Sequence, residues 1–277
     1  MFKGINKALA AMVIALAVAS CGNAGKDEAT KLYEQCAQEI ANHNYTGALV
    51  LLDTLNARYP DQTAVRRNGL RLRATAMEGI ASDSIGSADR ALAEATLRLE
   101  AIAPKFRHVD SSVGLEGYFL PVGVSEEIMN ANAVQARVTD KGYFYIVANV
   151  QGRAIGLRSI SLVDGADSMT SAEISPSRVI NVEGSEIASF NPEEVDGLAP
   201  WLAAHPGASK VVLSGAKGDV SIKLTDKLRQ ELLDCYEYAS ALQADRLAKI
   251  RREKYERMLA TARDQLANLP LPEQEAK

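Results

Sequence analysis

The fold of this chain is decided by the stretch Val134-Gln135-Ala136-Arg137-Val138-Thr139-Asp140-Lys141-Gly142-Tyr143-Phe144-Tyr145-Ile146-Val147. Two segments rich in β-branched and aromatic residues flank Asp140-Lys141-Gly142, and the glycine stands where a tight turn needs a positive φ. The stretch therefore predicts two antiparallel strands joined by a hairpin.

Similar short segments continue on both sides of this hairpin. Further strands are expected at 117–122, 155–163, 169–174, 178–182, 186–190, 210–214 and 219–224. Regularly spaced strands with glycine turns predict an antiparallel sandwich or partly open barrel over residues 113–224. One helical insertion is expected at 192–204, capped by Asn191 and started by Pro192. Trp201, near its end, is either a glycan platform or a core residue buried against the sheet.

The residues before the β module have a helical pattern instead. Residues 29–108 are expected to form four antiparallel helices, with a first at 29–41, a second at 46–58 and a third at 62–80. The fourth follows Ser82-Asp83-Ser84, and its apolar residues alternate steps of four and three, as in a helix packed along another helix.

The first two helices resemble a tetratricopeptide repeat. The aromatic, small, aliphatic and proline positions of its second helix are filled by Tyr45, Ala48, Leu49, Leu52, Leu55 and Pro60. The first helix departs from the pattern at Leu32, Gln35 and Cys36, and no second copy follows at the family's 34-residue period. The resemblance implies a concave face that holds a peptide or protein, with Tyr45 as a candidate contact. The alternative is a helical spacer.

Residues 225–269 predict one long terminal helix, since neither glycine nor proline occurs before Pro270. The apolar seam of its first half, which can return to the helical module, consists of Leu228, Leu232, Cys235, Ala239 and Leu242. Its second half is basic and amphipathic, with Arg252 and Tyr255 as candidate partner contacts. Such a helix can lie on an anionic membrane, bind a partner helix, pack along the bundle or self-associate as a coiled coil. Residues 270–277 are expected to be a disordered tail.

The start of the chain has the layout of a secretory signal, with Lys3 and Lys7 before the apolar run Ala8–Ala19. This run is too short for a membrane-spanning helix, which needs about 20 residues. Val18-Ala19-Ser20-Cys21 resembles the lipobox of bacterial lipoproteins. The resemblance implies that residues 1–20 are removed, that Cys21 receives the lipid and that residues 21–28 form a tether. The alternative is an ordinary secretory signal in which Cys21 is coincidental.

The residues after Cys21 bear on location. No aspartate follows Cys21 to retain the protein at the inner membrane, so the resemblance favours the outer membrane. Lys26-Asp27-Glu28 is similar to the acidic export signals of Bacteroidetes-type surface lipoproteins. A solvated helix start explains the same triplet, so the periplasmic face and the cell surface both stay open.

Charge, cysteine content and the lack of catalytic motifs exclude several classes of function. Loss of Lys3 and Lys7 with the signal takes the formal net charge from −4 to −6, which argues against nucleic acid as a partner. Cys36 and Cys235 either form a disulfide or are small buried residues. The histidines show no ligand spacing for zinc, and no nucleophile-elbow or P-loop pattern occurs, so we expect no cofactor, no metal and no catalysis.

Two functions follow from these patterns. The first is a non-enzymatic envelope lipoprotein of α+β fold that holds another envelope protein through its helical surfaces. The second is a surface lipoprotein whose β module binds a glycan or peptide.

Overall fold

The computed structural model describes residues 24–110, 116–182 and 184–271. The helices are α1 (Ala24–Ala41), α2 (Tyr45–Arg58), α3 (Thr63–Ile102), α4 (Pro192–Val195), α5 (Leu198–Ala204) and α6 (Asp226–Asn268), with 3-10 turns at Ala103–Lys105 and Pro176–Arg178. The strands are β1 (Phe106–Val109), β2 (Tyr118–Pro121), β3 (Ala133–Thr139), β4 (Phe144–Gln151), β5 (Leu157–Asp164), β6 (Asp167–Thr170), β7 (Val179–Val182), β8 (Ser185–Phe190), β9 (Lys210–Gly215) and β10 (Gly218–Lys223).

The chain divides into two compact units. One contains the described residues up to Ile85 and from Lys254 onward, and the other contains Gly86–Glu253, so the boundary falls within both α3 and α6. The predicted signal, the lipidation site and most of the predicted tail lie outside the described residues. Residues 24–28, which we expected in the tether, belong to α1.

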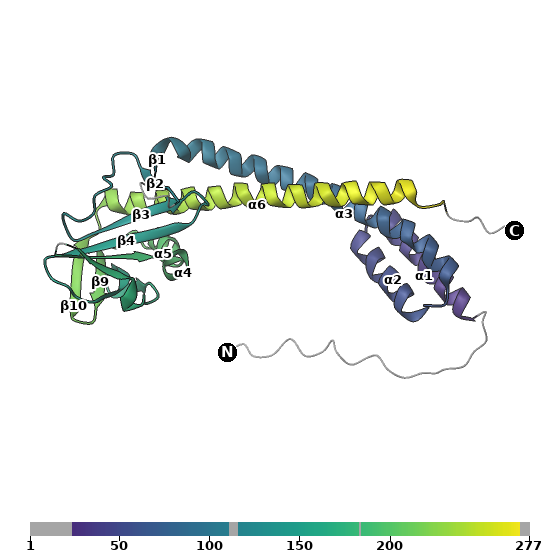
Figure 1. The fold of residues 1–277 in the computed structure, drawn as a ribbon, viewed down its shortest axis with the longest axis horizontal. Coiled ribbons are helices and arrows are strands. Elements are labelled where there is room, and N and C mark those ends of the chain that lie inside the picture. The colour runs from purple at the N-terminus through teal and green to yellow at the C-terminus, as the bar shows by residue number, and fades with distance from the viewer. Residues whose placement is uncertain (1–23, 111–115, 183, 272–277) are drawn as a thin grey trace. The chain divides into compact units, whose positions relative to one another are not determined.

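The first unit is a helical bundle in which α1 and α2 lie side by side (Figure 1). Its buried core consists of Ala29, Cys36, Leu52 and Leu55, with Leu32, Leu49, Leu51, Tyr59, Val65 and Leu72 packed against them. α2 begins after Asn44, whose Oδ1 accepts a hydrogen bond from Gly47 N at 3.2 Å and caps the helix. Tyr59 Oη, just after α2, donates to Glu28 Oε2 of α1 at 2.6 Å. The two helices are thus joined by apolar and polar contacts.

The predicted break at Ser82-Asp83-Ser84 is wrong, because α3 runs without interruption from Thr63 to Ile102. Serine and aspartate cost at most about 0.7 kcal/mol each in a helix interior, which packing easily outweighs. Buried alanines continue on both sides of the triplet, at Ala81 and Ala88. The N-terminal region therefore has three helices rather than four.

The second unit has the predicted α+β fold, with two antiparallel sheets and no closed barrel. The six-stranded sheet has the order β1-β2-β3-β4-β8-β7, and the four-stranded sheet has the order β10-β9-β5-β6. Every strand predicted from the sequence is present, although β6 ends earlier than expected. β1 lies inside the region predicted to be helical, because a four-residue strand after Pro104 is defined only by its pairing with distant β2.

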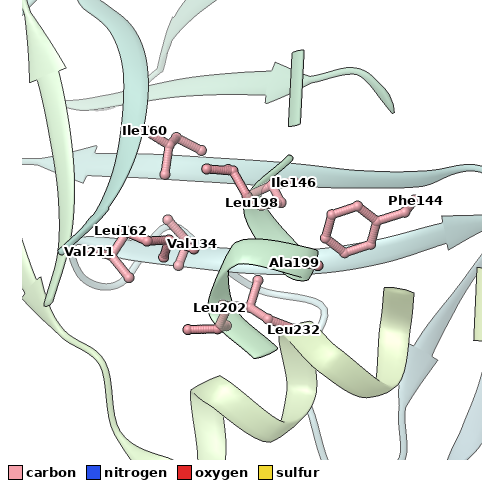
Figure 2. Close-up of a pocket in the computed structure, with 10 residues that line it drawn as sticks. All are labelled: Val134, Phe144, Ile146, Ile160, Leu162, Leu198, Ala199, Leu202, Val211 and Leu232. Carbon is pink, nitrogen blue, oxygen red and sulfur yellow. The ribbon is translucent and has the colours of Figure 1, made fainter. Parts of the chain in front are cut away.

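The core of the second unit is filled. α5 and the first half of α6 pack against the sheets, and the predicted seam residues Leu232, Cys235 and Ala239 are buried there together with Ile102 at the end of α3. The apolar seam of α6 therefore packs on the β module and not only on the helical module. Figure 2 shows apolar side chains of the sheets, α5 and α6 gathered around one small space. The volume of this space is about 10 Å³, no more than one water molecule needs. This core is not a ligand pocket.

Candidate ligand groove on the outer face of the six-stranded sheet

The six-stranded sheet has one face in the core and one face outside it. Successive side chains of a strand point to opposite faces. Phe144, Ile146 and Ala148 of β4 are in the core, so Tyr145, Val147 and Asn149 point to the outer face. The register places Arg137 beside Tyr145 and Gln135 beside Val147. The outer face is therefore a set of rows that cross β3, β4 and β8.

Half of this face is covered by residues 122–132, between β2 and β3, which we call the strap. Gln135 Nε2 donates to Ser125 O at 2.6 Å, and Asn149 Nδ2 donates to Ala131 O at 2.7 Å. Ser185 Oγ of β8 donates to Met129 O at 3.3 Å. The strap is thus held across three strands by side chains that bind its backbone carbonyls.

The strap does not satisfy every polar atom beneath it. Asn149 is 0% exposed, and its Oδ1 is the one buried side-chain nitrogen or oxygen without a hydrogen bond among the residues that the structure describes. A buried acceptor without a partner costs about 1–3 kcal/mol.

The other half of the face is an open groove of about 840 Å³. It is lined by Thr139, Tyr143, Tyr145, Ser189, Asn191, Pro192 and Glu193. The β3–β4 hairpin supplies the first three, and the end of β8 with the start of α4 supplies the others. Tyr143 is 43% exposed. The groove thus offers two aromatic rings beside hydroxyl, amide and carboxylate groups.

Arg137 lies opposite Tyr145 in the register of β3 and β4. Its guanidinium lies 4.3 Å from the centre of the Tyr118 ring, and its Nε donates to Gln135 Oε1 at 2.6 Å. Desolvation by burial raises the pKa of the Tyr145 hydroxyl, while the charge and hydrogen bond of Arg137 act in the opposite direction. The net effect raises the pKa above its usual value near 10, so Tyr145 is a neutral phenol at neutral pH.

The acidic side of the groove contains two adjacent glutamates with different environments. Glu194 Oε2 accepts a hydrogen bond from Asn191 N at 2.5 Å, and its Oε1 is 2.5 Å from Arg178 Nη1. Asn191 is thus the N-cap predicted for the helical insertion, and together with Glu194 it forms a capping box. Glu193 is exposed and makes no hydrogen bond or ion pair within the described ranges. Its carboxylate is available to a ligand.

The candidate residues from the sequence do not line this groove. Tyr45 packs on Gly79 of α3, where a Cβ would collide with the Tyr45 ring. The Tyr45 hydroxyl is 2.8 Å from His43 Nδ1. Arg252 Nε donates to Asp89 Oδ1 at 2.8 Å. Lys254 Nζ lies 5.3 Å from the centre of the Tyr255 ring.

Trp201 is a core residue with a covered face. It packs against the core of the second unit, and the His205 ring stacks on it with centroids 4.0 Å apart. His205 Nδ1 also lies 2.8 Å from Trp201 O. Of the two alternatives, the structure therefore favours burial against the sheet, because the imidazole occupies the ring face that a glycan would need.

The two described cysteines are free thiols, so the Cys36–Cys235 disulfide is not formed. Each is buried, Cys36 in the core of the first unit and Cys235 in the core of the second. Burial raises the pKa of both thiols, and that of Cys235 far above its usual range. Their chemistry is that of small apolar core residues.

His108 has carboxylate neighbours that the sequence spacing did not reveal. Its Nδ1 is 3.0 Å from Asp110 Oδ1, and its Nε2 is 2.7 Å from Asp140 Oδ1 on the hairpin turn. Among the described residues, no group of three or more His, Cys, Asp or Glu could hold a metal ion. The contacts tie β1 to the β3–β4 hairpin.

Sequence reasoning missed the groove, although one signal for it was present. In an alternating strand, Tyr143 and Tyr145 share the face opposite to Phe144 and Ile146. Aromatic residues on the polar side of a half-buried strand point outward, where they are available for binding. Ser189 and Glu193 join them only through the pairing of β4 with β8, which no local pattern reveals.

The comparisons with known proteins give no further assignment, since no family model, no curated protein and no solved structure matches this chain. Among the described residues, no helix combines the length and the apolar character that crossing a membrane requires.

Proposed function

We propose that this chain is a bacterial envelope lipoprotein, anchored to the outer membrane through Cys21, that holds another protein without catalysing a reaction. The anchor rests on the lipobox-like residues 18–21 and the basic and apolar segments before them. Several acyl chains on one cysteine provide stable anchoring, because each buried CH₂ contributes about 0.8 kcal/mol.

The single observation that carries the binding function is the groove on the outer sheet face. The core behind it is filled, whereas this surface offers an open groove in which the β module can hold a ligand. Tyr143 and Tyr145 offer rigid amphipathic contact area, as tyrosines do at protein interfaces. The groove, rather than the helical faces that the sequence favours, is the surface that the geometry supports best.

The experiment is a capture of partners from detergent-solubilised envelope with the full-length protein as bait. The wild-type chain is expected to recover a defined protein that is lost when Tyr143 and Tyr145 are both replaced by alanine. Glu173→Gln, a substitution at an exposed residue outside the groove, is the control. If the wild-type chain and the double tyrosine variant recover the same protein, the groove is not the contact surface.

Anchoring is tested separately. Labelled palmitate is expected to enter the wild-type chain and not Cys21→Ala, and label in the variant would contradict the lipobox assignment. Protease treatment of intact cells then separates the two membrane faces, because only a surface protein is cleaved before the outer membrane is opened.

A second candidate surface lies on α6. Leu247 and Ile250 are 51% and 49% exposed, respectively, although they belong to the apolar stripe of this helix. Exposed apolar residues one turn apart suit a partner helix or a second copy of this chain. If Leu247→Ser with Ile250→Ser abolishes capture or self-association and the tyrosine variants do not, the helix is the contact surface.

A further inference from the structure

We propose that the groove takes a non-helical polypeptide segment that carries a basic side chain, laid across β3, β4 and β8 beside the strap. This inference rests on the proposed function, because it names the chemistry of the partner at the same groove.

The strap shows how this face binds polypeptide. Sheet side chains from three strands, Gln135, Asn149 and Ser185, donate to three strap carbonyls. In the reverse direction, Asn132 Oδ1 of the strap accepts from Gln151 N at 2.7 Å. Contacts of this kind depend on the backbone of the bound segment and hardly on its sequence. The covered half of the face is therefore already a site for an irregular chain.

The uncovered half continues the same rows with the same chemistry. Ser189 follows Gln135 and Val147 in one row, and Asn191 comes directly after the partner of Ile146 at the end of β8. Among the described residues, the Ser189 hydroxyl makes no hydrogen bond, while its backbone carbonyl accepts from Arg178 Nη2 at 2.5 Å. A segment beside the strap thus meets hydroxyl and amide groups for its backbone and two tyrosine rings for its side chains.

The charges in the groove favour a cation on that segment. Glu193 has no partner among the described residues, whereas neighbouring Glu194 is held by Asn191 N and Arg178. The faces of Tyr143 and Tyr145 attract cations as well. A lysine or arginine therefore finds the Glu193 carboxylate and two aromatic faces at this end of the groove.

The test uses random decapeptides displayed on phage, selected on the full-length lipidated protein in detergent. Peptides with a central lysine or arginine are expected to be enriched. An enriched peptide, synthesised with a fluorescent label, is expected to bind about tenfold more weakly to the variant with both Tyr143→Ala and Tyr145→Ala. Glu193→Gln is expected to weaken binding about fivefold and to remove the preference for basic residues.

Two controls keep these results specific. Glu173→Gln removes an exposed carboxylate outside the groove, where its ion pair with Arg158 is long at 3.8 Å, and is expected to bind as the wild type does. Fluorescence of Trp201, the one tryptophan of the chain, reports whether each variant retains the core.

Each outcome decides the inference. No enrichment, or equal enrichment on the double tyrosine variant, overturns it. Binding of arrayed glycans that is lost in the tyrosine variant, without peptide enrichment, replaces the polypeptide by a carbohydrate. Capture of an envelope partner without peptide binding refutes the inference alone. Peptide binding without any captured partner refutes the proposed function and leaves the groove chemistry intact.

Discussion

Replacement of Gly142 by alanine tests the packing of the β3–β4 hairpin on α6. Gly142 has a φ of +81° at the turn, and its N–H donates to Thr139 O at 2.8 Å. A Cβ at this position would lie 2.8 Å from Leu242 Cβ and 3.1 Å from Ala239 O. Gln243 Nε2 of α6 also donates to Gly142 O at 2.7 Å. The glycine therefore serves both the turn and the contact with the helix.

The free energy of unfolding is expected to fall by about 3–6 kcal/mol. The left-handed backbone costs an L residue about 1–2 kcal/mol. The contact with Leu242 is far inside ordinary carbon separation, and overpacking of this kind costs about 1–3 kcal/mol. If the hairpin moves away from α6 to relieve this contact, it also loses the hydrogen bond from Gln243, which contributes about 1 kcal/mol.

Gly123→Ala is the matched control, because its φ of +83° is nearly the same and nothing lies within 4 Å of the added Cβ. This variant is expected to lose only the backbone term of about 1–2 kcal/mol. Urea unfolding followed by Trp201 fluorescence measures both, since the tryptophan lies in the same unit. Equal destabilisation of the two variants would refute the packing argument.

Three further predictions concern polar groups of the second unit. Glu186 is 3% exposed and accepts hydrogen bonds from Ile155 N and Gly156 N, both at 2.9 Å. Glu186→Gln is therefore expected to lower the free energy of unfolding, measured in urea, by about 2–3 kcal/mol. An unchanged free energy would contradict the charge-assisted hydrogen bonds. Arg229 donates to three backbone carbonyls at and after the end of α5. Arg229→Lys replaces the forked guanidinium by a single ammonium, so it is expected to lower the unfolding free energy by about 1–2 kcal/mol in thermal unfolding. An unchanged midpoint would show that one ammonium suffices. Burial raises the pKa of Tyr238 above its usual value near 10. The unfolded state therefore ionises first, and stability is expected to fall as pH rises above about 10, less steeply in Tyr238→Phe; identical slopes would contradict this.

The hairpin and the terminal helix could be predicted because their determinants are local. Alternation in Tyr143–Val147 and the glycine at 142 define two strands and a turn. The absence of glycine and proline over residues 226–268 defines α6. The capping box at Asn191 could be predicted for the same reason, since all of its atoms lie within four residues.

The continuity of α3 and the groove could not be predicted, because long-range contacts determine them. Ser82-Asp83-Ser84 favours a break by local propensity, and buried alanines on either side outweigh it. The strap has no periodic pattern of apolar residues. Its position on the sheet depends on hydrogen bonds from residues up to 56 positions away in the sequence, such as the bond from Ser185 to Met129. Without the strap, the remaining half of the outer face cannot be recognised as a groove.

α6 belongs to the compact unit of the β module up to Glu253, and this part of the helix is not a detachable arm. Its first half supplies Leu232, Cys235 and Tyr238 to the core, and Tyr238 stacks on Phe106 of β1 with centroids 4.3 Å apart. Cutting the chain before Asp226 would expose these side chains and the sheet surface that they cover, at about 1.5–3 kcal/mol for each large apolar residue. Loss of a partner after such a deletion would therefore report unfolding. Point substitutions at exposed positions, such as Glu193 in the groove and Ile250 on α6, separate binding from folding because neither side chain contributes to the core.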